Sequence, residues 1–95
     1  MNDGKFQWDD DKAAVNRAKH GVTFEAAKRA FRDAFAIDWL DESDAYGEER
    51  FVTIGMVDGR LIVVAFAMRG EAIRIISARL AGRAERKLYH DENRD

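Results

Sequence analysis

The sequence predicts an α+β fold, in which a small, mainly antiparallel sheet has helices packed on one side, in the order β-α-α-β-β-β-β-α. Two observations predict this fold. Helix signals concentrate in residues 9–31 and 82–91, and the strand signals between them follow one another through short turns. Because the 95 residues contain no internal repeat, low-complexity segment or linker, we expect one domain over residues 1–95.

The first third of the chain predicts a short strand and two helices. Residues 6–8 form the expected strand, and Asp9 or Asp10 is placed to cap a helix that runs to about His20. Gly21 suits the left-handed residue that ends such a helix. The apolar positions of this helix are Ala14, Val15 and Ala18, and its polar face carries Lys12, Asn16 and Lys19. The second helix is predicted from its cap and apolar spacing, at Thr23, Phe24, Ala27, Ala30 and Phe31.

Four more strands are predicted in succession, over residues 35–40, 50–57, 60–68 and 72–78. A polar loop over residues 41–49 separates the first two. Asp58-Gly59 is a typical two-residue hairpin turn, and Gly70-Glu71 is a second turn. From about residue 82 to 91 the pattern is helical, with a narrow apolar seam formed by Ala81, Ala84 and Leu88.

Charge is unevenly distributed along the chain. Residues 1–50 carry 8 basic and 12 acidic side chains, residues 51–95 carry 8 and 6, and the net charge is −2. Residues 38–49 contain six acids and no base, whereas residues 69–87 contain six bases and two acids. A net acidic charge argues against a nucleic-acid binder, but a chain with one basic segment can bind an anion locally.

Composition disfavours several classes of protein. The chain has no cysteine, which excludes disulfides and thiol nucleophiles and fits a cytoplasmic location. The only histidines are His20 and His90, and no metal or cofactor motif is present, so we expect neither a metal nor a cofactor. The longest uncharged apolar run, residues 61–68, is short of the roughly 20 residues that span a bilayer, and the acidic N-terminus shows no secretory signal.

Lys19-His20, at the end of the first predicted helix, is one candidate for chemistry. A structural interpretation is that both cations satisfy the last carbonyls and the dipole of the helix. A functional interpretation is a lysine that binds phosphate beside an imidazole that acts as acid or base near pH 7. The spacing alone favours the structural interpretation.

A second candidate is the run of cations from the last strand into the last helix. In strict alternation Arg74 and Arg79 lie on opposite faces of the strand, and they point the same way only if the strand ends or bulges near Ser77. Guanidinium groups bind phosphate bidentately and stabilise its charge in the transition state. The structural alternative, an ion-paired surface helix, is the more usual fate of such a run.

Most of the aromatic residues have core spacing. Trp39, Tyr46 and Tyr89 border polar segments, where an aromatic ring is also placed to stack on nucleic-acid bases.

Four stretches together resemble the BrnT family, the toxin half of bacterial type II toxin–antitoxin pairs. They are Phe6-x-Trp8-Asp9, residues 16–27, residues 47–55, and residues 74–79 followed by Glu85, Arg86 and Tyr89. They occur in the family's order and span nearly the whole chain. Gly82 stands where the family usually has Thr or another polar cap, which costs the last helix roughly a few tenths of a kcal/mol.

The resemblance implies a RelE-like fold and a metal-independent toxin that cleaves RNA and stops translation. It also implies an antitoxin, encoded beside the toxin, with a ribbon-helix-helix DNA-binding part. The two proteins would form a 2:2 complex that contacts operator DNA through the antitoxin, with no role for a membrane. We assign catalytic roles to Lys19, His20, Arg74, Arg79, Glu85 and Tyr89. We assign RNA contacts to Arg69, Arg83, Arg86 and Lys87.

Two hypotheses follow. In the first, Arg74 and Arg79 hold the phosphate, His20 or Glu85 takes the 2′-hydroxyl proton, and Tyr89 or Lys19 assists the leaving oxygen. In the second, the basic strand–helix segment belongs to a non-catalytic binding module for a protein or nucleic acid. A binding module needs the charges but not the proton-transfer groups, and this separates the two hypotheses.

Overall fold

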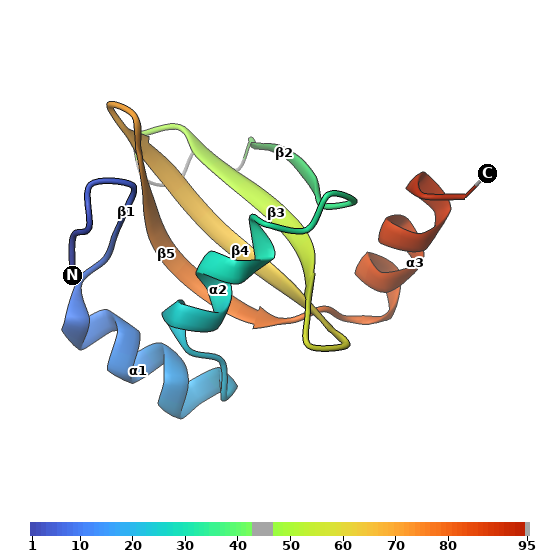
Figure 1. Cartoon of the computed structure of the whole chain (residues 1–95), viewed down its shortest axis with the longest axis horizontal. Coiled ribbons are helices and arrows are strands. Elements are labelled where there is room, and N and C mark those ends of the chain that lie inside the picture. Colours follow the sequence, from blue (N-terminus) through green and yellow to red (C-terminus); the bar gives the residue numbers. More distant parts are fainter. Residues whose placement is uncertain (43–46, 95) are drawn as a thin grey trace.

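The computed structural model describes residues 1–42 and 47–94, and it confirms the α+β fold (Figure 1). Within these residues, three helices and five strands follow in the predicted order. The elements are β1 (Phe6–Gln7), α1 (Asp10–His20), α2 (Phe24–Ala30), β2 (Ile37–Asp41), β3 (Arg50–Val57), β4 (Arg60–Arg69), β5 (Ala72–Leu80) and α3 (Arg83–Glu92). Residues 43–46 of the predicted polar loop lie outside the described part of the chain.

The sheet is mainly antiparallel, as predicted. Its strand order is β1-β5-β4-β3-β2, and among the described strands β1 alone pairs in parallel, with β5. The β3–β4 hairpin turns at Asp58 and Gly59, whose φ angles of 50° and 80° are both positive, as a type I′ turn requires. Since β4 lies between β3 and β5, its near-continuous apolar sequence is explained by burial.

The residues predicted to cap the first two helices do so. The Asp9 side chain accepts a hydrogen bond from the backbone N–H of Lys12, and the Thr23 hydroxyl accepts one from the N–H of Ala26, both at 3.0 Å. Gly21, at a φ of 70°, ends α1 in the left-handed region. Asp9 and Gly21 thus fix the two ends of α1, whose last turn carries two of the predicted site residues.

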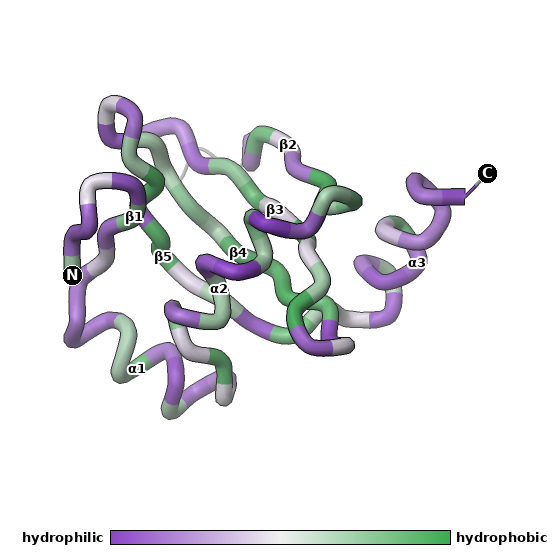
Figure 2. The backbone as a smooth tube through the Cα atoms, viewed as in Figure 1, coloured by the Kyte–Doolittle hydropathy of each residue, from purple (hydrophilic) through white to green (hydrophobic). Residues whose placement is uncertain are grey.

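One face of the sheet packs against α1 and α2 and forms the larger core cluster. Its buried members are Phe6, Trp8, Val22, Phe24, Ala27, Ala30, Val57, Ile62, Val64, Ile75 and Ala78. Figure 2 shows the contrast between the hydrophobic β4 and the largely hydrophilic α1 and α3. Within the described residues, no helix has both the length and the apolar character that a membrane crossing requires.

α3 packs on the opposite face of the sheet, so the prediction that all helices lie on one side is wrong. In β4, Val63 lies between two residues of the larger cluster and therefore points to the other face. There it belongs to a second cluster, formed by Ile54, Leu61, Val63, Ala81 and Tyr89. α3 lies at the end of the molecule far from α1 (Figure 1), and the middle of this face, around Val52 and Ala65, remains half-exposed.

The apolar positions of α1 are not the residues that this helix buries. Ala14, Val15 and Ala18 are exposed, Val15 to 66%, whereas Asn16 is buried. The Asn16 amide explains this orientation, because it donates to the carbonyl of Ala78 (2.8 Å) and accepts from its N–H (3.1 Å). The side chain thus pairs with the edge of β5 where β1 has already ended.

The predicted apolar seam of α3 is only partly correct. Ala81 is buried, but Ala84 and Leu88 are exposed. Tyr89 is the helix residue that packs into the second cluster. A tyrosine can take this position only if its hydroxyl finds a partner, and sequence spacing does not reveal one.

Gly55 sets the contact between β3 and α2. A Cβ atom at this position would lie 2.3 Å from the carbonyl oxygen of Ala30, which is backbone and cannot rotate away. We therefore expect Gly55→Ala to lower the free energy of unfolding by about 1–3 kcal/mol, measured by urea denaturation. An unchanged midpoint would show that α2 moves off the sheet at little cost.

Candidate active site

A β-bulge in β5 changes the direction of its side chains. Ser77 pairs with Ala65 in β4, but the next pair along the ladder joins Ile75 to Phe66. Ile76 is therefore an extra residue between two consecutive pairs. From this point the side-chain alternation of β5 shifts by one residue.

The bulge places the two predicted phosphate-binding arginines on one face. Arg79 pairs with Val63 and Arg74 pairs with Ala67. Residues directly opposite across a ladder point to the same face, so both arginines share the face of Val63, opposite α1 and α2. We call the part of this face that carries Arg74 and Arg79 the arginine face. Ser77 lies between them on this face. The condition that the sequence set for a shared site, a bulge near Ser77, is met.

Arg79 is held by a bidentate ion pair with Glu85. Its Nη1 and Nη2 atoms donate to the two carboxylate oxygens at 2.7 and 2.6 Å, and Glu85 also accepts from the N–H of Gly82 at 2.8 Å. The hydrogen bond from Arg79 lowers the pKa of Glu85, and Glu85 in turn raises the pKa of Arg79. Both groups are therefore charged at neutral pH, and the ion pair fixes the position of the Arg79 guanidinium.

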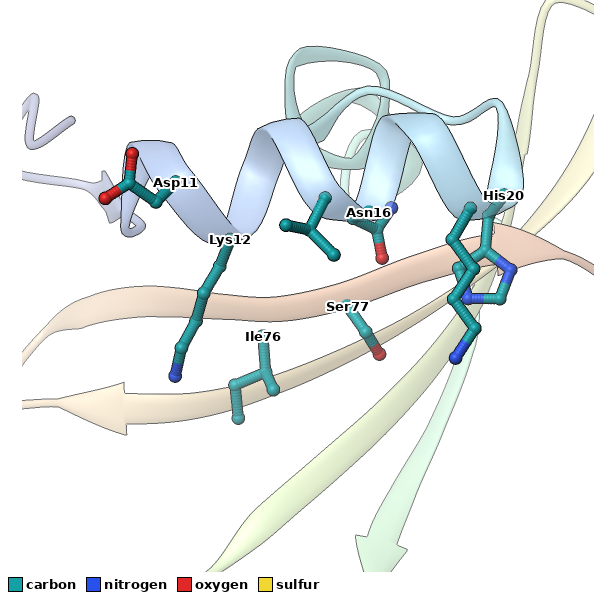
Figure 3. A pocket seen from close by; sticks show the side chains of 8 residues that line it. Asp11, Lys12, Asn16, His20, Ile76 and Ser77 are labelled. Atoms are coloured by element: carbon teal, nitrogen blue, oxygen red, sulfur yellow. The ribbon is translucent and has the colours of Figure 1, made fainter.

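Lys19 and His20 reach the same strand from α1. They line an open pocket of about 350 Å³ together with Ser77, which faces the arginine-bearing side of the sheet. Figure 3 shows Lys12 and His20 extending from α1 on either side of Ser77 and its neighbour in the bulge. Ser77 therefore lines the pocket of the first sequence candidate and lies between the two arginines of the second.

Tyr89 has a different environment. Its hydroxyl donates to the Asp33 carboxylate at 2.7 Å, and the same carboxylate accepts from the N–H groups of Met56 (2.8 Å) and Phe35 (2.9 Å). Burial and the contact with Asp33 raise the pKa of Tyr89 to about 12. Although burial opposes it, these three hydrogen bonds lower the pKa of Asp33. The pair thus anchors α3 to the segment that leads into β2.

The phenol of Tyr89 can be tested by itself. Tyr89→Phe keeps the buried ring and removes one hydrogen bond to a charged group, so we expect the free energy of unfolding to fall by about 1.5–3 kcal/mol. Urea denaturation at pH 7 measures this loss. A variant as stable as the wild type would show that the two backbone donors satisfy Asp33 without the phenol.

The four predicted RNA-binding cations do not form one cluster. Arg83, Arg86 and Lys87 are exposed on α3, and Lys87 forms an ion pair with Asp91. Arg69 lies at the end of β4 and forms an ion pair with Glu48. Arg69 pairs with Ala72 at the start of β5, and the α3 cations follow the end of β5.

The three aromatic residues that were predicted to stack on bases have different environments. Trp39 is half-exposed, Tyr89 is buried, and Tyr46 lies outside the described residues. In residues 1–42 and 47–94, no three His, Asp or Glu side chains are grouped in a way that could hold a metal ion.

Sequence reasoning missed three residues that shape the site. In the sequence, Ser77 serves only as a marker of strand alternation, Asn16 falls on a polar helix face, and Asp33 carries no signal for a site. Lys12 and Lys19, seven residues apart on one helix face, gave a signal for the α1 side of the pocket. No sequence signal links Asn16 or Asp33 to partners more than 50 residues away.

Together, the fold and the site define a small α+β protein with an arginine-bearing open sheet face beside a lysine–histidine pocket. Residues 8–85 match the family described as the ribonuclease toxin, BrnT, of type II toxin–antitoxin systems. The chain therefore belongs to the BrnT family, which confirms the resemblance seen in the sequence. The family is one of ribonuclease toxins, and a type II system implies an antitoxin partner. No curated protein matches the chain.

Proposed function

We propose that this chain is a metal-independent endoribonuclease that cleaves RNA at the arginine face of β5 and thereby inhibits translation. The observation that carries the proposal is the bulge at Ile76, which sets Arg74 and Arg79 on one face with Ser77 between them. The pocket that contains Lys19 and His20 opens beside the same serine. Phosphate-binding and proton-transferring groups thus flank one point on the sheet.

In the proposed reaction, the 2′-oxygen of the substrate attacks the adjacent phosphorus and the bond from phosphorus to the 5′-oxygen breaks. The products are a 2′,3′-cyclic phosphate and a 5′-hydroxyl. Arg79 and Arg74 offset the charge that grows on the phosphate oxygens. Arg79 gives two of its five donors to Glu85 and also donates to the Leu80 carbonyl at 3.4 Å, and the donors that remain are assigned to the substrate phosphate.

Proton transfer is assigned to the α1 side of the site. His20 takes the 2′-hydroxyl proton and Lys19 supplies a proton to the 5′-oxygen. Glu85 is the alternative base, but its pKa is lowered by Arg79. Tyr89 is the alternative acid, but its hydroxyl is bound to Asp33 and its pKa is raised to about 12. These environments favour His20 and Lys19 over the other pair.

We further propose that the antitoxin carries a ribbon-helix-helix DNA-binding part and forms a 2:2 complex with the toxin in the cytoplasm. Operator DNA is then contacted through the antitoxin alone. The mainly antiparallel sheet with packed helices supports the RelE-like fold that the family resemblance implies.

The proposal is tested by expressing the chain from a tightly repressed promoter, with and without its antitoxin. We expect growth arrest, RNA fragments with 2′,3′-cyclic phosphate ends, and reversal by the antitoxin. Cleavage by purified protein should persist in EDTA. Intact RNA during arrest would contradict the proposal.

A triple variant distinguishes the proposed enzyme from a non-catalytic binding module. Combining His20→Ala, Glu85→Gln and Tyr89→Phe removes the proposed base, His20, together with the alternative base and the alternative acid, and keeps every arginine. A ribonuclease loses its toxicity in this variant, whereas a binding module retains it.

A further inference from the structure

A groove between β2 and α3 has a different character from the arginine face. It has a volume of about 560 Å³ and is lined by Ile37, Asp38, Trp39, Leu88 and Glu92. Trp39 and Leu88 are each 39% exposed. Large apolar side chains that remain exposed on two neighbouring elements indicate a surface that a partner covers. We call this surface the β2–α3 groove.

The strand that borders the groove is also open to pairing. β2 ends the sheet, so its outer edge has no strand partner among the described residues. Leu40, on the opposite face of β2 from Trp39, is exposed as well. An edge strand with exposed apolar side chains is a ready template for another chain, and soluble proteins usually protect such edges. A partner that fills the groove would cover this edge too.

Charge identifies the kind of partner. The polar members of the β2–α3 groove, Asp38 and Glu92, are both acidic, and residues 38–49 contain no base. This surface repels RNA phosphates and attracts a segment with Lys or Arg beside apolar side chains. Trp39 and Ile37 lie on the same face of the sheet as Arg74 and Arg79, but three strands away from them, about 14 Å at the usual strand spacing. The acidic, apolar groove thus lies at the opposite edge of this face from the two arginines.

We infer that the β2–α3 groove is the docking site of the antitoxin, which inserts apolar side chains between Trp39 and Leu88 and pairs basic side chains with Asp38 and Glu92. The basic character of the antitoxin rests on its proposed role as the DNA-binding partner, because a protein that binds DNA carries Lys and Arg. The inference also explains why an RNA-cleaving chain has a net charge of −2: part of its acidic surface serves the antitoxin.

The test measures the affinity of purified toxin for its purified antitoxin by calorimetry. We expect Leu88→Ala and Trp39→Ala each to weaken binding by about 30-fold or more, as central apolar contacts of an interface do. Val15→Ala, at an equally apolar and more exposed position on α1, is the matched control and should bind normally. RNA cleavage by free Leu88→Ala should equal that of the wild type, and circular dichroism checks its fold.

The sign of the charge is tested separately. The double variant Asp38→Lys with Glu92→Lys should weaken antitoxin binding about 10-fold or more, whereas Glu71→Lys, in the exposed β4–β5 turn, should not. Tighter binding by the double variant would show an acidic partner and overturn the inference.

Three other outcomes would also overturn it. The affinity of Leu88→Ala and Trp39→Ala for the antitoxin could be unchanged. Trp39→Ala could lose RNA cleavage while it keeps the antitoxin, which would make RNA the occupant. Sedimentation could reveal a toxin dimer that the groove variants dissociate, which would make a second copy the occupant. Antitoxin binding is measured without RNA, so this test does not depend on RNA cleavage. If the wild-type toxin cleaved no RNA but the groove variants still bound the antitoxin weakly, the proposed ribonuclease activity would be wrong and the docking site would stand.

Discussion

Arg79→Ala should lower RNA cleavage by at least about 10²–10³-fold, as expected when one preorganised donor to a transition-state charge is removed. Arg79 is the cation best fixed in the site, because Glu85 holds its guanidinium through two hydrogen bonds. The variant should remain folded, since a partly exposed ion pair contributes only about 0–1 kcal/mol to stability. Cleavage of a defined RNA by purified protein, with a urea denaturation curve for each variant, measures both effects.

Arg29→Ala is the matched control, because Arg29 of α2, on the other face of the sheet, forms a similar bidentate ion pair with Asp58. It should cleave RNA at the wild-type rate. Arg79→Lys keeps the charge but loses the bidentate fork, so we expect only partial rescue. Full toxicity from a folded Arg79→Ala variant would remove this residue from the mechanism.

The order and type of the elements could be predicted from the sequence because their signals are local. Asp9, Gly21 and Thr23 mark helix ends through bonds that span three or four residues, and Asp58-Gly59 specifies its own turn. These interactions do not depend on the rest of the fold.

The buried faces of α1 and α3 could not be predicted, because they depend on contacts with distant parts of the chain. Ala14, Val15 and Ala18 have apolar spacing, but α1 instead turns Asn16 inward to the edge of β5. In α3, Tyr89 is buried in preference to Leu88 because Asp33 satisfies its hydroxyl. Both outcomes depend on polar partners that are distant in sequence, and hydrophobic periodicity carries no information about them.

The candidate site was predicted in part. The sequence pattern identifies Arg74 and Arg79 as candidates and shows that they share a face only if β5 bulges or ends near Ser77. No residue type near Ser77 indicates that bulge. The meeting of Lys19 and His20 with β5 follows from the packing of α1, which Asn16 controls. The site therefore depends on tertiary contacts that residue spacing leaves open.

Asn16→Ala should lower the free energy of unfolding by about 2–4 kcal/mol, because it leaves buried backbone groups without partners. The amide donates to the carbonyls of Ala78 (2.8 Å) and Val22 (3.0 Å) and accepts from the N–H of Ala78 (3.1 Å). Urea denaturation measures the loss, with the fluorescence of the buried Trp8 as a probe. RNA cleavage should also fall, since α1 carries Lys19 and His20.

Asn93→Ala is the control for this prediction, because it removes a similar set of hydrogen bonds at an exposed position. Asn93 also donates to two carbonyls, those of Phe35 and Tyr89, but it is exposed at the end of α3. Water can replace its amide, so we expect its loss to cost less than about 1 kcal/mol. If Asn16→Ala cost no more than Asn93→Ala, water from the adjacent pocket would be satisfying Ala78. The α1–β5 contact would then be held by apolar packing, and the Asn16 amide would not be what positions Lys19 and His20 beside the arginines.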